Sequence, residues 1–220
     1  VLPQITAWRR DIHQHPELSN REARTSKLVA DELKKLGYTV HAGLAHTGVA
    51  GVLIGGKPGP KLAIRADMDA LPVTEQVDLP FASKVTTTFN DQQTGVMHAC
   101  GHDAHTAILL GVADALVAMR KELPGEVMLV FQPAEEGAPG QEEGGASLML
   151  KEGLFKDFKP DAMFGLHVFS SVEAGQIAVR SGPLMAASDR FAIKVIGRQT
   201  HGSAPWNGID MCHDPARCQS

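Results

Sequence analysis

The sequence predicts an α/β sandwich, in which helices cover a central sheet. Short β-rich runs bounded by Gly or Pro alternate along the chain with segments whose apolar residues recur at helical spacing. Strands that alternate with helices in this way are typical of a sheet covered by helices. A second observation is that side chains of the kinds that bind metals lie where several of the expected strands end.

Two helices are expected near the N-terminus. Trp8, Ile12 and His15 share one helical face before Pro16 interrupts the pattern. A second run of apolar residues at helical spacing is Leu28, Val29, Leu33 and Leu36. Gly37 then suits the end of a helix, where the backbone often turns left-handed.

Three β-rich runs follow, at residues 38–41, 49–54 and 62–66. A tight turn between the last two is indicated by Gly55, Gly56, Pro58 and Pro60. A long polar connection then leads to Gly95. The remaining elements expected in this part are helices at 102–121 and 146–153 and strands at 126–131 and 162–168.

The character of the sequence changes near Pro183, where we place a boundary between a domain at residues 1–183 and a second one at 184–220. Alternating residues at 190–197 predict a strand of the second domain, whereas residues 210–220 show no helical or strand period. The part after Pro183 is shorter than a domain of typical size. We therefore expect the second domain to be truncated.

Composition excludes several classes of function. With 43% hydrophobic and 21% charged residues, the chain falls in the globular range. A net charge of −4 without a basic cluster argues against nucleic acid as a partner, and no apolar run is long enough to cross a membrane. We see no secretory signal, and three cysteines (Cys100, Cys212 and Cys218) do not form a disulfide framework, so we expect a reducing, cytoplasmic location.

The densest group of metal-binding side chains is MHACGHDAH at residues 97–105. It offers thiol, imidazole and carboxylate groups where a loop enters a helix, and a metal ion suits that mixture. For an isolated Cys and His, a buried cysteine beside solvent-facing histidines is the more common explanation.

Three more groups lie at or just after the ends of expected strands. They are Glu135 with Glu136, His167, and Asp67 with Asp69. Taken singly, two loop glutamates are usually a solvated turn, and a lone strand histidine is usually a core residue. Four such groups at strand ends or turns together favour a site for two divalent ions, and zinc, manganese, cobalt and nickel all suit the mixed ligands.

Five segments, in this order, resemble signatures of the M20 metallopeptidase family, in its amidohydrolase branch of hippurate hydrolase-like and auxin-conjugate hydrolase-like enzymes. They are RDIHQHPE at 10–17, RADMDALP at 65–72, HACGHDAH at 98–105, QPAEEG at 132–137 and FGLHV at 164–168. The similarity runs from about Trp8 to Asp210. It implies a three-layer catalytic domain with a mixed sheet, like that of zinc-dependent exopeptidases, followed by the start of a smaller α+β lid or dimerisation domain.

The resemblance also implies roles for single residues. Cys100, His102, Glu136 and His167 would be metal ligands, with Cys100 as a bridge between two ions. Glu135 would be the general base, which takes a proton from a metal-activated water and passes it to the leaving amine.

Two further roles follow from the same resemblance. His201 would reach the active site of a partner in a homodimer formed through the lid, and there help to hold the substrate carbonyl. Asp69 would support a ligand from behind. Family members continue further, with one more metal-binding histidine, and residues from about 211 depart from the family pattern, so truncation is expected on this ground as well.

The expected activity is hydrolysis of the amide bond in an N-acyl amino acid, such as an N-acetyl or hippurate-like compound. A dipeptidase or aminoacylase would use the same chemistry. A non-catalytic, truncated metal-binding remnant is the alternative from another class. A third hypothesis is a cysteine hydrolase with Cys100 as nucleophile and His102 or His105 as base.

Overall fold

The computed structural model describes residues 1–89, 91–186, 191, 193–194 and 196–209. The chain divides into two compact units, Val1–Ala174 and Gly175–Ser220. The boundary that we place near Pro183 stays a prediction. Among the helices of the described ranges, none is both long and apolar enough to span a bilayer.

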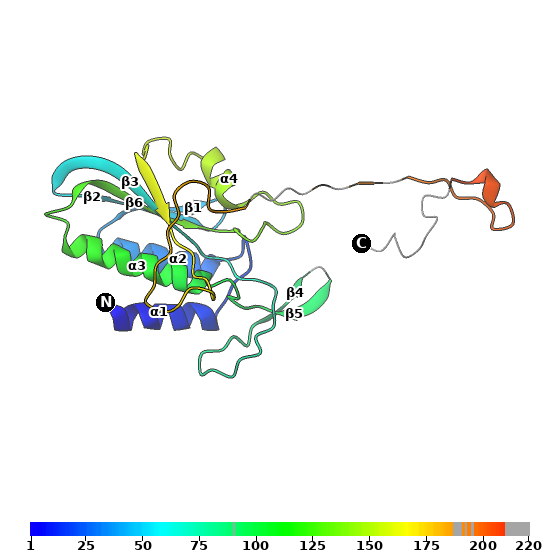
Figure 1. The fold of residues 1–220 in the computed structure, drawn as a ribbon, viewed down its shortest axis with the longest axis horizontal. Helices are drawn as coiled ribbons and strands as arrows, with labels where there is room; N and C mark the ends of the chain where they lie inside the picture. Colours follow the sequence, from blue (N-terminus) through cyan, green and yellow to red (C-terminus); the bar gives the residue numbers. More distant parts are fainter. Residues whose placement is uncertain (90, 187–190, 192, 195, 210–220) are drawn as a thin grey trace. The chain divides into compact units, whose positions relative to one another are not determined.

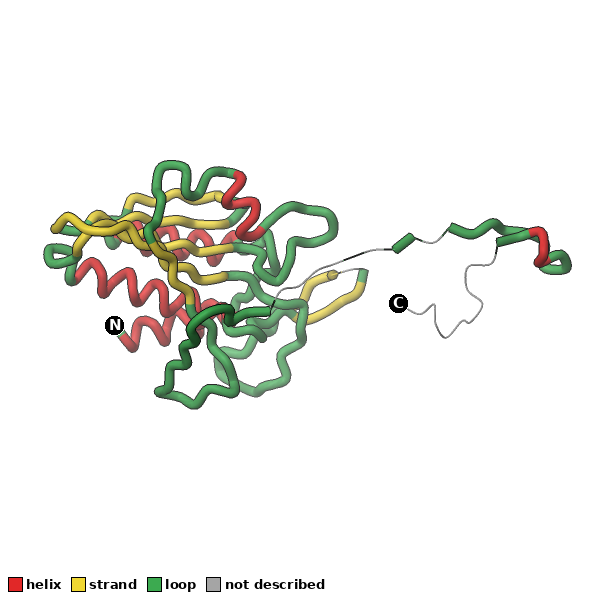
Figure 2. The backbone as a smooth tube through the Cα atoms, turned by 45° about the horizontal axis from the view of Figure 1, so that its top comes forward, coloured by secondary structure: helices red, strands yellow, loops and turns green. Residues whose placement is uncertain are grey.

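A five-stranded sheet forms the centre of the first unit (Figures 1 and 2). Its strands, in spatial order, are β1 (Thr39–Leu44), β2 (Gly48–Ile54), β6 (Pro124–Gln132), β3 (Lys57–Asp67) and β7 (Ala162–Gly165). The pairs β1–β2 and β2–β6 are antiparallel, whereas β6–β3 and β3–β7 are parallel. The expectation of a mixed sheet is therefore confirmed.

Helices lie on both faces of this sheet, which gives the three layers expected (Figure 1). The helices are α1 (Leu2–Gln14), α2 (Ala23–Lys35), α3 (His102–Ala118) and α4 (Gly145–Lys151). Helices α2 and α3 pack on one face, α1 packs against α3, and α4 lies on the other face. Gly37, with φ +81°, ends the α2 segment as the sequence predicts.

The central strand β6 shows why the sheet needs both helical layers. Val127, Leu129 and Phe131 are buried in the core beneath α2 and α3. Met128 and Val130 point to the opposite face and are buried with Met149 of α4. A strand buried on both faces reads as a continuous apolar run, as this one does.

The topology brings the carboxyl ends of three parallel strands to one edge of the sheet. Asp67 at the end of β3 pairs in register with Gln132 at the end of β6, and Arg65 pairs with Gly165 at the end of β7. Ligand sites of open α/β sheets lie beyond such strand ends.

Three expectations about the strands were wrong in part. Strand β3 begins at Lys57, five residues earlier than expected, because the prolines of residues 57–61 are accommodated where the register with β6 is interrupted. The polar connection contains a hairpin, β4 (Thr86–Phe89) and β5 (Gln92–Gly95). Strand β7 ends at Gly165, so His167 lies in the loop that follows it.

The second unit contains little regular structure among its described residues. Arg198 and Ile209 form an antiparallel bridge, and a short 3-10 helix covers Pro205–Asn207. A strand is expected at residues 190–197, but the described residues of this range belong to no strand. The antiparallel bridge to Ile209 is made by Arg198, just after the range. The tail expected from about 211, with two of the cysteines, lies outside the described residues.

A buried charged pair joins α1 to the start of α3. His13 is 3% exposed, and its ring contacts Asp103 (Nδ1 to Oδ2, 2.8 Å) and Glu75 (Nε2 to Oε1, 3.1 Å). The hydrogen bond to Asp103 raises the pKa of His13 above its ordinary 6.5, although burial opposes the shift.

We expect His13 to make stability depend on pH. Because its pKa is raised in the folded state, its contribution is fully present below pH 6.5 and is lost as the pH rises through the folded value. The His13→Gln variant should therefore be less stable than the parent by about 1–3 kcal/mol near pH 5.5, and by less near pH 9. Urea unfolding across this range checks it, and a difference that grows with pH would contradict it.

Candidate metal centre

The loop that enters α3 requires a glycine between two of the expected ligands. Gly101 has φ +87° and precedes His102, the first residue of the helix. A Cβ atom at position 101 would lie 2.4 Å from Cγ2 of Val168, the residue after His167. Gly101 therefore permits both the left-handed turn and the close approach of the His167 loop to Cys100 and His102.

One nitrogen of His102 is held by the protein and the other is not. Nδ1 lies 2.8 Å from the Asp69 carbonyl oxygen and 3.2 Å from Asp69 Oδ1, so it carries the proton and donates it. Nε2 is buried and has no hydrogen-bond partner among the described residues. In the neutral ring this leaves Nε2 without a proton, and a buried imidazole nitrogen without a protein partner is the arrangement that a metal ligand needs.

Carboxylates surround this nitrogen at distances longer than a hydrogen bond. His102 Nε2 lies 3.7 Å from Asp67 Oδ2, 3.8 Å from Glu136 Oε1 and 3.9 Å from Glu135 Oε2. His102, Glu135 and Glu136 form one group whose donor atoms all lie within 4.8 Å of one another. The Glu135 side chain is 41% exposed and that of Glu136 is 23% exposed, so Glu135 is the more open to solvent.

Cys100 and His167 form a second group of potential metal ligands together with His102. The donor atoms of Cys100, His102 and His167 lie within 4.8 Å of one another, and Cys100 Sγ is 3.4 Å from His167 Nε2. His167 Nδ1 donates to the carbonyl oxygen of Val168 at 2.7 Å, which directs Nε2 toward the thiol. Thiol, imidazole and carboxylate donors thus converge around His102.

Asp69 connects His102 to the glutamate loop. Besides the His102 ring, it accepts hydrogen bonds at Oδ2 from the Ser19 hydroxyl (2.6 Å) and from the Glu136 backbone N–H (3.0 Å). The carboxylate is 1% exposed. Asp69 therefore fixes both an imidazole and the backbone of a neighbouring carboxylate.

A third group comprises Asp67, His102 and His105, but His105 has neither nitrogen free. Its Nδ1 donates to Asp67 Oδ1 at 2.6 Å, and its Nε2 accepts the backbone N–H of Val168 at 2.9 Å. Burial opposes ionisation of Asp67, yet the His105 hydrogen bond and the Arg65 charge lower its pKa to about 2. His105 thus holds the His167 loop in place.

The charges of the group are unbalanced without a cation. Burial, and then the Glu136 charge, raise the pKa of the Cys100 thiol to about 12. Burial lowers the proton affinity of His102, but the Asp69 hydrogen bond and the nearby carboxylates outweigh it and raise the pKa. A divalent ion would supply the missing positive charge, and the donor set suits zinc or a similar borderline ion.

Residues 63–212 match the model of "Peptidase family M20/M25/M40", which is more than half of the chain. The chain belongs to this family. The resemblance seen in the sequence is therefore confirmed.

The relatives of this M20 chain include amide hydrolases with different names. "Thermostable carboxypeptidase 1" of Saccharolobus solfataricus is 50% identical over 212 residues, which are 94% of this chain and 51% of the relative. "N-acyl-L-amino acid amidohydrolase" of Geobacillus stearothermophilus is 43% identical over 210 residues, or 96% of this chain and 53% of the relative. The chain thus spans about half the length of these relatives.

A solved structure supports the fold. The M20 chain matches a Bacillus subtilis protein described as a dinuclear metal-binding peptidase of the M20 family, with a TM-score of 0.72 and 42% identity. The match covers 83% of this chain and 47% of that one.

The structure brings most of the expected site residues of this M20 protein together. Within the first unit, the close groups contain Cys100, His102, Glu135, Glu136 and His167, and Asp69 lies against His102. His201 belongs to the second unit, where its Nδ1 lies 2.8 Å from the Ser203 hydroxyl.

Sequence reasoning missed a buried carboxylate that holds the glutamate loop. Glu22 is 0% exposed, and it accepts the backbone N–H of Ala134 (2.9 Å) and the Thr47 hydroxyl (2.5 Å). Ala134 has φ +47°, which is costly for a residue with a side chain, and it immediately precedes Glu135. No local pattern marks Glu22, because its partners are distant in the sequence.

Proposed function

We propose that this protein is part of a metal-dependent amide hydrolase that acts on N-acyl amino acids. The observation that carries the proposal is the buried Nε2 of His102, which has no protein partner in the described structure and is surrounded by donor groups. The family and the relative named as an N-acyl-L-amino acid amidohydrolase point to the same chemistry.

Four residues would hold two divalent ions. These are Cys100, His102, Glu136 and His167, with Cys100 as the bridge between the ions. Zinc, manganese, cobalt and nickel all suit this donor set. When bound, such ions would acidify a water molecule and polarise the scissile carbonyl.

Glu135 would be the general base. Its greater exposure leaves the carboxylate accessible to water and substrate, and it lies near the expected ligands. It would take a proton from the attacking water and deliver it to the leaving amine nitrogen. Glu22 would keep this residue in position by holding the backbone at Ala134.

We expect Asp69→Asn to lower metal affinity roughly 10–100-fold, as loss of a group that orients a ligand usually does. An amide oxygen can still accept the His102 proton, but the amide NH2 would then face the Ser19 hydroxyl and the Glu136 N–H, which are both donors. Calorimetric zinc titration measures the change. Asp161→Asn, at a carboxylate that accepts the Lys61 N–H, is the control. Equal affinity in both variants would contradict the role of Asp69.

The cysteine hydrolase hypothesis gains no support from the geometry. Among the described residues, the imidazole that is hydrogen-bonded to the Cys100 thiol is that of His167. Both nitrogens of His105 have other partners. Nucleophilic cysteines have a lowered pKa, and that of Cys100 is raised.

Several finer expectations remain predictions. A homodimer formed through the lid, with His201 reaching a partner's site, is one of them. A cytoplasmic location is another. A dipeptidase or aminoacylase would use the same groups, and one relative is named a carboxypeptidase.

Elemental analysis and an assay together test the proposal. The purified chain is analysed for metal and incubated with N-acetyl and N-benzoyl amino acids, with and without zinc or manganese. Hydrolysis that is lost with a chelator and restored by metal is the expected result. Bound metal without turnover would favour the non-catalytic remnant, and a chain that binds no metal would contradict the site itself.

A further inference from the structure

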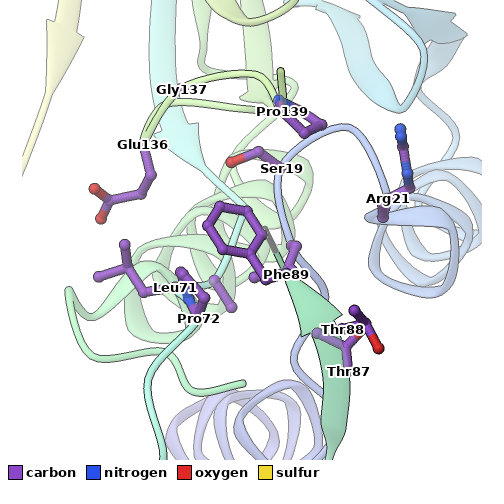
Figure 3. A pocket seen from close by; sticks show the side chains of 12 residues that line it. Ser19, Arg21, Leu71, Pro72, Thr87, Thr88, Phe89, Glu136, Gly137 and Pro139 are labelled. Carbon is purple, nitrogen blue, oxygen red and sulfur yellow. The ribbon is translucent and has the colours of Figure 1, made fainter. Parts of the chain in front are cut away.

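A cavity of about 380 Å³ lies beside the candidate metal centre. It is lined by Leu18, Ser19 and Arg21, by residues 70–72, by residues 87–89 of β4 and by the loop that carries Glu136 (Figure 3). We call it the Phe89 cavity. In Figure 3, Glu136 and Arg21 lie on opposite sides of the view, with the Phe89 ring between them.

The cavity adjoins the place where the scissile amide must lie. Glu136 lines the cavity, and its Oε1 is also 3.8 Å from Nε2 of His102. A substrate whose carbonyl faces these donor groups therefore extends one of its two sides into the Phe89 cavity. The volume falls within the usual range for small-molecule sites, about 300–1,000 Å³.

The walls favour an uncharged, apolar group. Apolar side chains that line the cavity include Leu18, Leu71, Pro72 and Phe89. Among the polar lining groups, the Ser19 hydroxyl donates to Asp69 at 2.6 Å, and the Thr88 hydroxyl accepts from Gln93 at 2.6 Å.

The one cation among the lining residues is already paired. Arg21 donates twice to the carboxylate of Glu142, from NH1 to Oε2 at 3.0 Å and from NH2 to Oε1 at 2.5 Å. Glu136, at the other side of the cavity, is one of the residues proposed to hold the ions. The α-carboxylate of an N-acyl amino acid would therefore find no free cation among the described lining residues.

We propose that the Phe89 cavity receives the acyl side of the substrate, as a largely apolar group up to about the size of benzoyl. The amino acid side, with its carboxylate, lies outside the cavity. This assignment rests on the proposed hydrolysis of N-acyl amino acids and specifies which side of the amide this unit recognises.

Two ligands that carry a fluorinated ring on opposite sides of the amide test the assignment. They are para-fluorobenzoyl-glycine and N-acetyl-para-fluorophenylalanine, titrated against the zinc-loaded chain by fluorine NMR. Phe89→Ala should weaken binding of the first roughly tenfold, because the fluorobenzoyl ring loses its apolar contacts with Phe89. Binding of the second should be unchanged.

Two further variants sharpen the test. Thr86→Ala changes the same strand outside the cavity and should bind both ligands as the parent does. Leu71→Phe narrows the cavity from another wall. It should weaken binding of para-fluorobenzoyl-glycine and leave binding of N-acetyl-para-fluorophenylalanine unchanged. Circular dichroism establishes that each variant is folded.

The outcomes separate this assignment from the proposed function. A Phe89→Ala variant that weakens the phenylalanine ligand instead would overturn it, as would equal binding by all variants or no binding of the benzoyl ligand. If the binding pattern is as expected but neither ligand is hydrolysed, the cavity assignment stands and hydrolysis by this chain does not.

Discussion

In the zinc-loaded protein, Glu135→Gln is expected to lower kcat for N-benzoyl amino acids roughly 10²–10⁴-fold, the usual contribution of a general base. Glutamine keeps the shape of the side chain but cannot take a proton from water. Because Glu22 still holds the Ala134 N–H, the backbone of the loop should not move. Steady-state kinetics together with zinc analysis measure the effect.

The same loop offers a matched control for Glu135. Glu143 is exposed and pairs with Lys151, so Glu143→Gln should retain the activity of the parent. Zinc content should be the same in all three proteins. A Glu135→Gln variant that loses zinc in proportion to activity would show that Glu135 is a ligand, and undiminished activity would show that it has no role in proton transfer.

His102→Ala is expected to abolish the stabilisation of the fold by zinc. Zinc at 100 times its dissociation constant adds about 2.7 kcal/mol to the free energy of unfolding of a protein that binds it only when folded. The variant should gain none, because His102 belongs to all three close groups of donor atoms in the described part of the chain. Urea unfolding with and without zinc gives the difference.

His41→Ala serves as the control for this comparison, because His41 is an exposed histidine of β1. Its stabilisation by zinc should equal that of the parent. If His102→Ala is stabilised as strongly as the parent, zinc binds elsewhere and the site assignment is wrong.

Local patterns predict the elements of this fold better than their ends. The apolar run of β6 and the helical spacing of α2 are visible in the sequence because burial selects them directly. The hairpin of β4 and β5 is not, because its Thr and Gln residues show no apolar alternation. Likewise, Pro58 and Pro60 indicate a turn, but they lie within β3 where its register with β6 is interrupted.

In the candidate site, too, some residues can be predicted from the sequence and others cannot. Its donor residues can be recognised because rare combinations such as Cys100 and His102 fall in short motifs. The groups that hold them cannot, because their partners are far apart in the chain. Ser19 reaches Asp69, Glu22 reaches Ala134, and His105 reaches the backbone of Val168. Only the folded chain brings these groups together.

X-ray absorption at the zinc edge shows whether a metal ion binds at Cys100. Cys212 and Cys218 are first replaced by Ser, which leaves Cys100 as the only one of the three cysteines. The zinc-loaded protein should show a sulfur neighbour at about 2.3 Å, and Cys100→Ser should remove it. A spectrum with nitrogen and oxygen neighbours alone, while Cys100 is present, would rule out metal binding by Cys100.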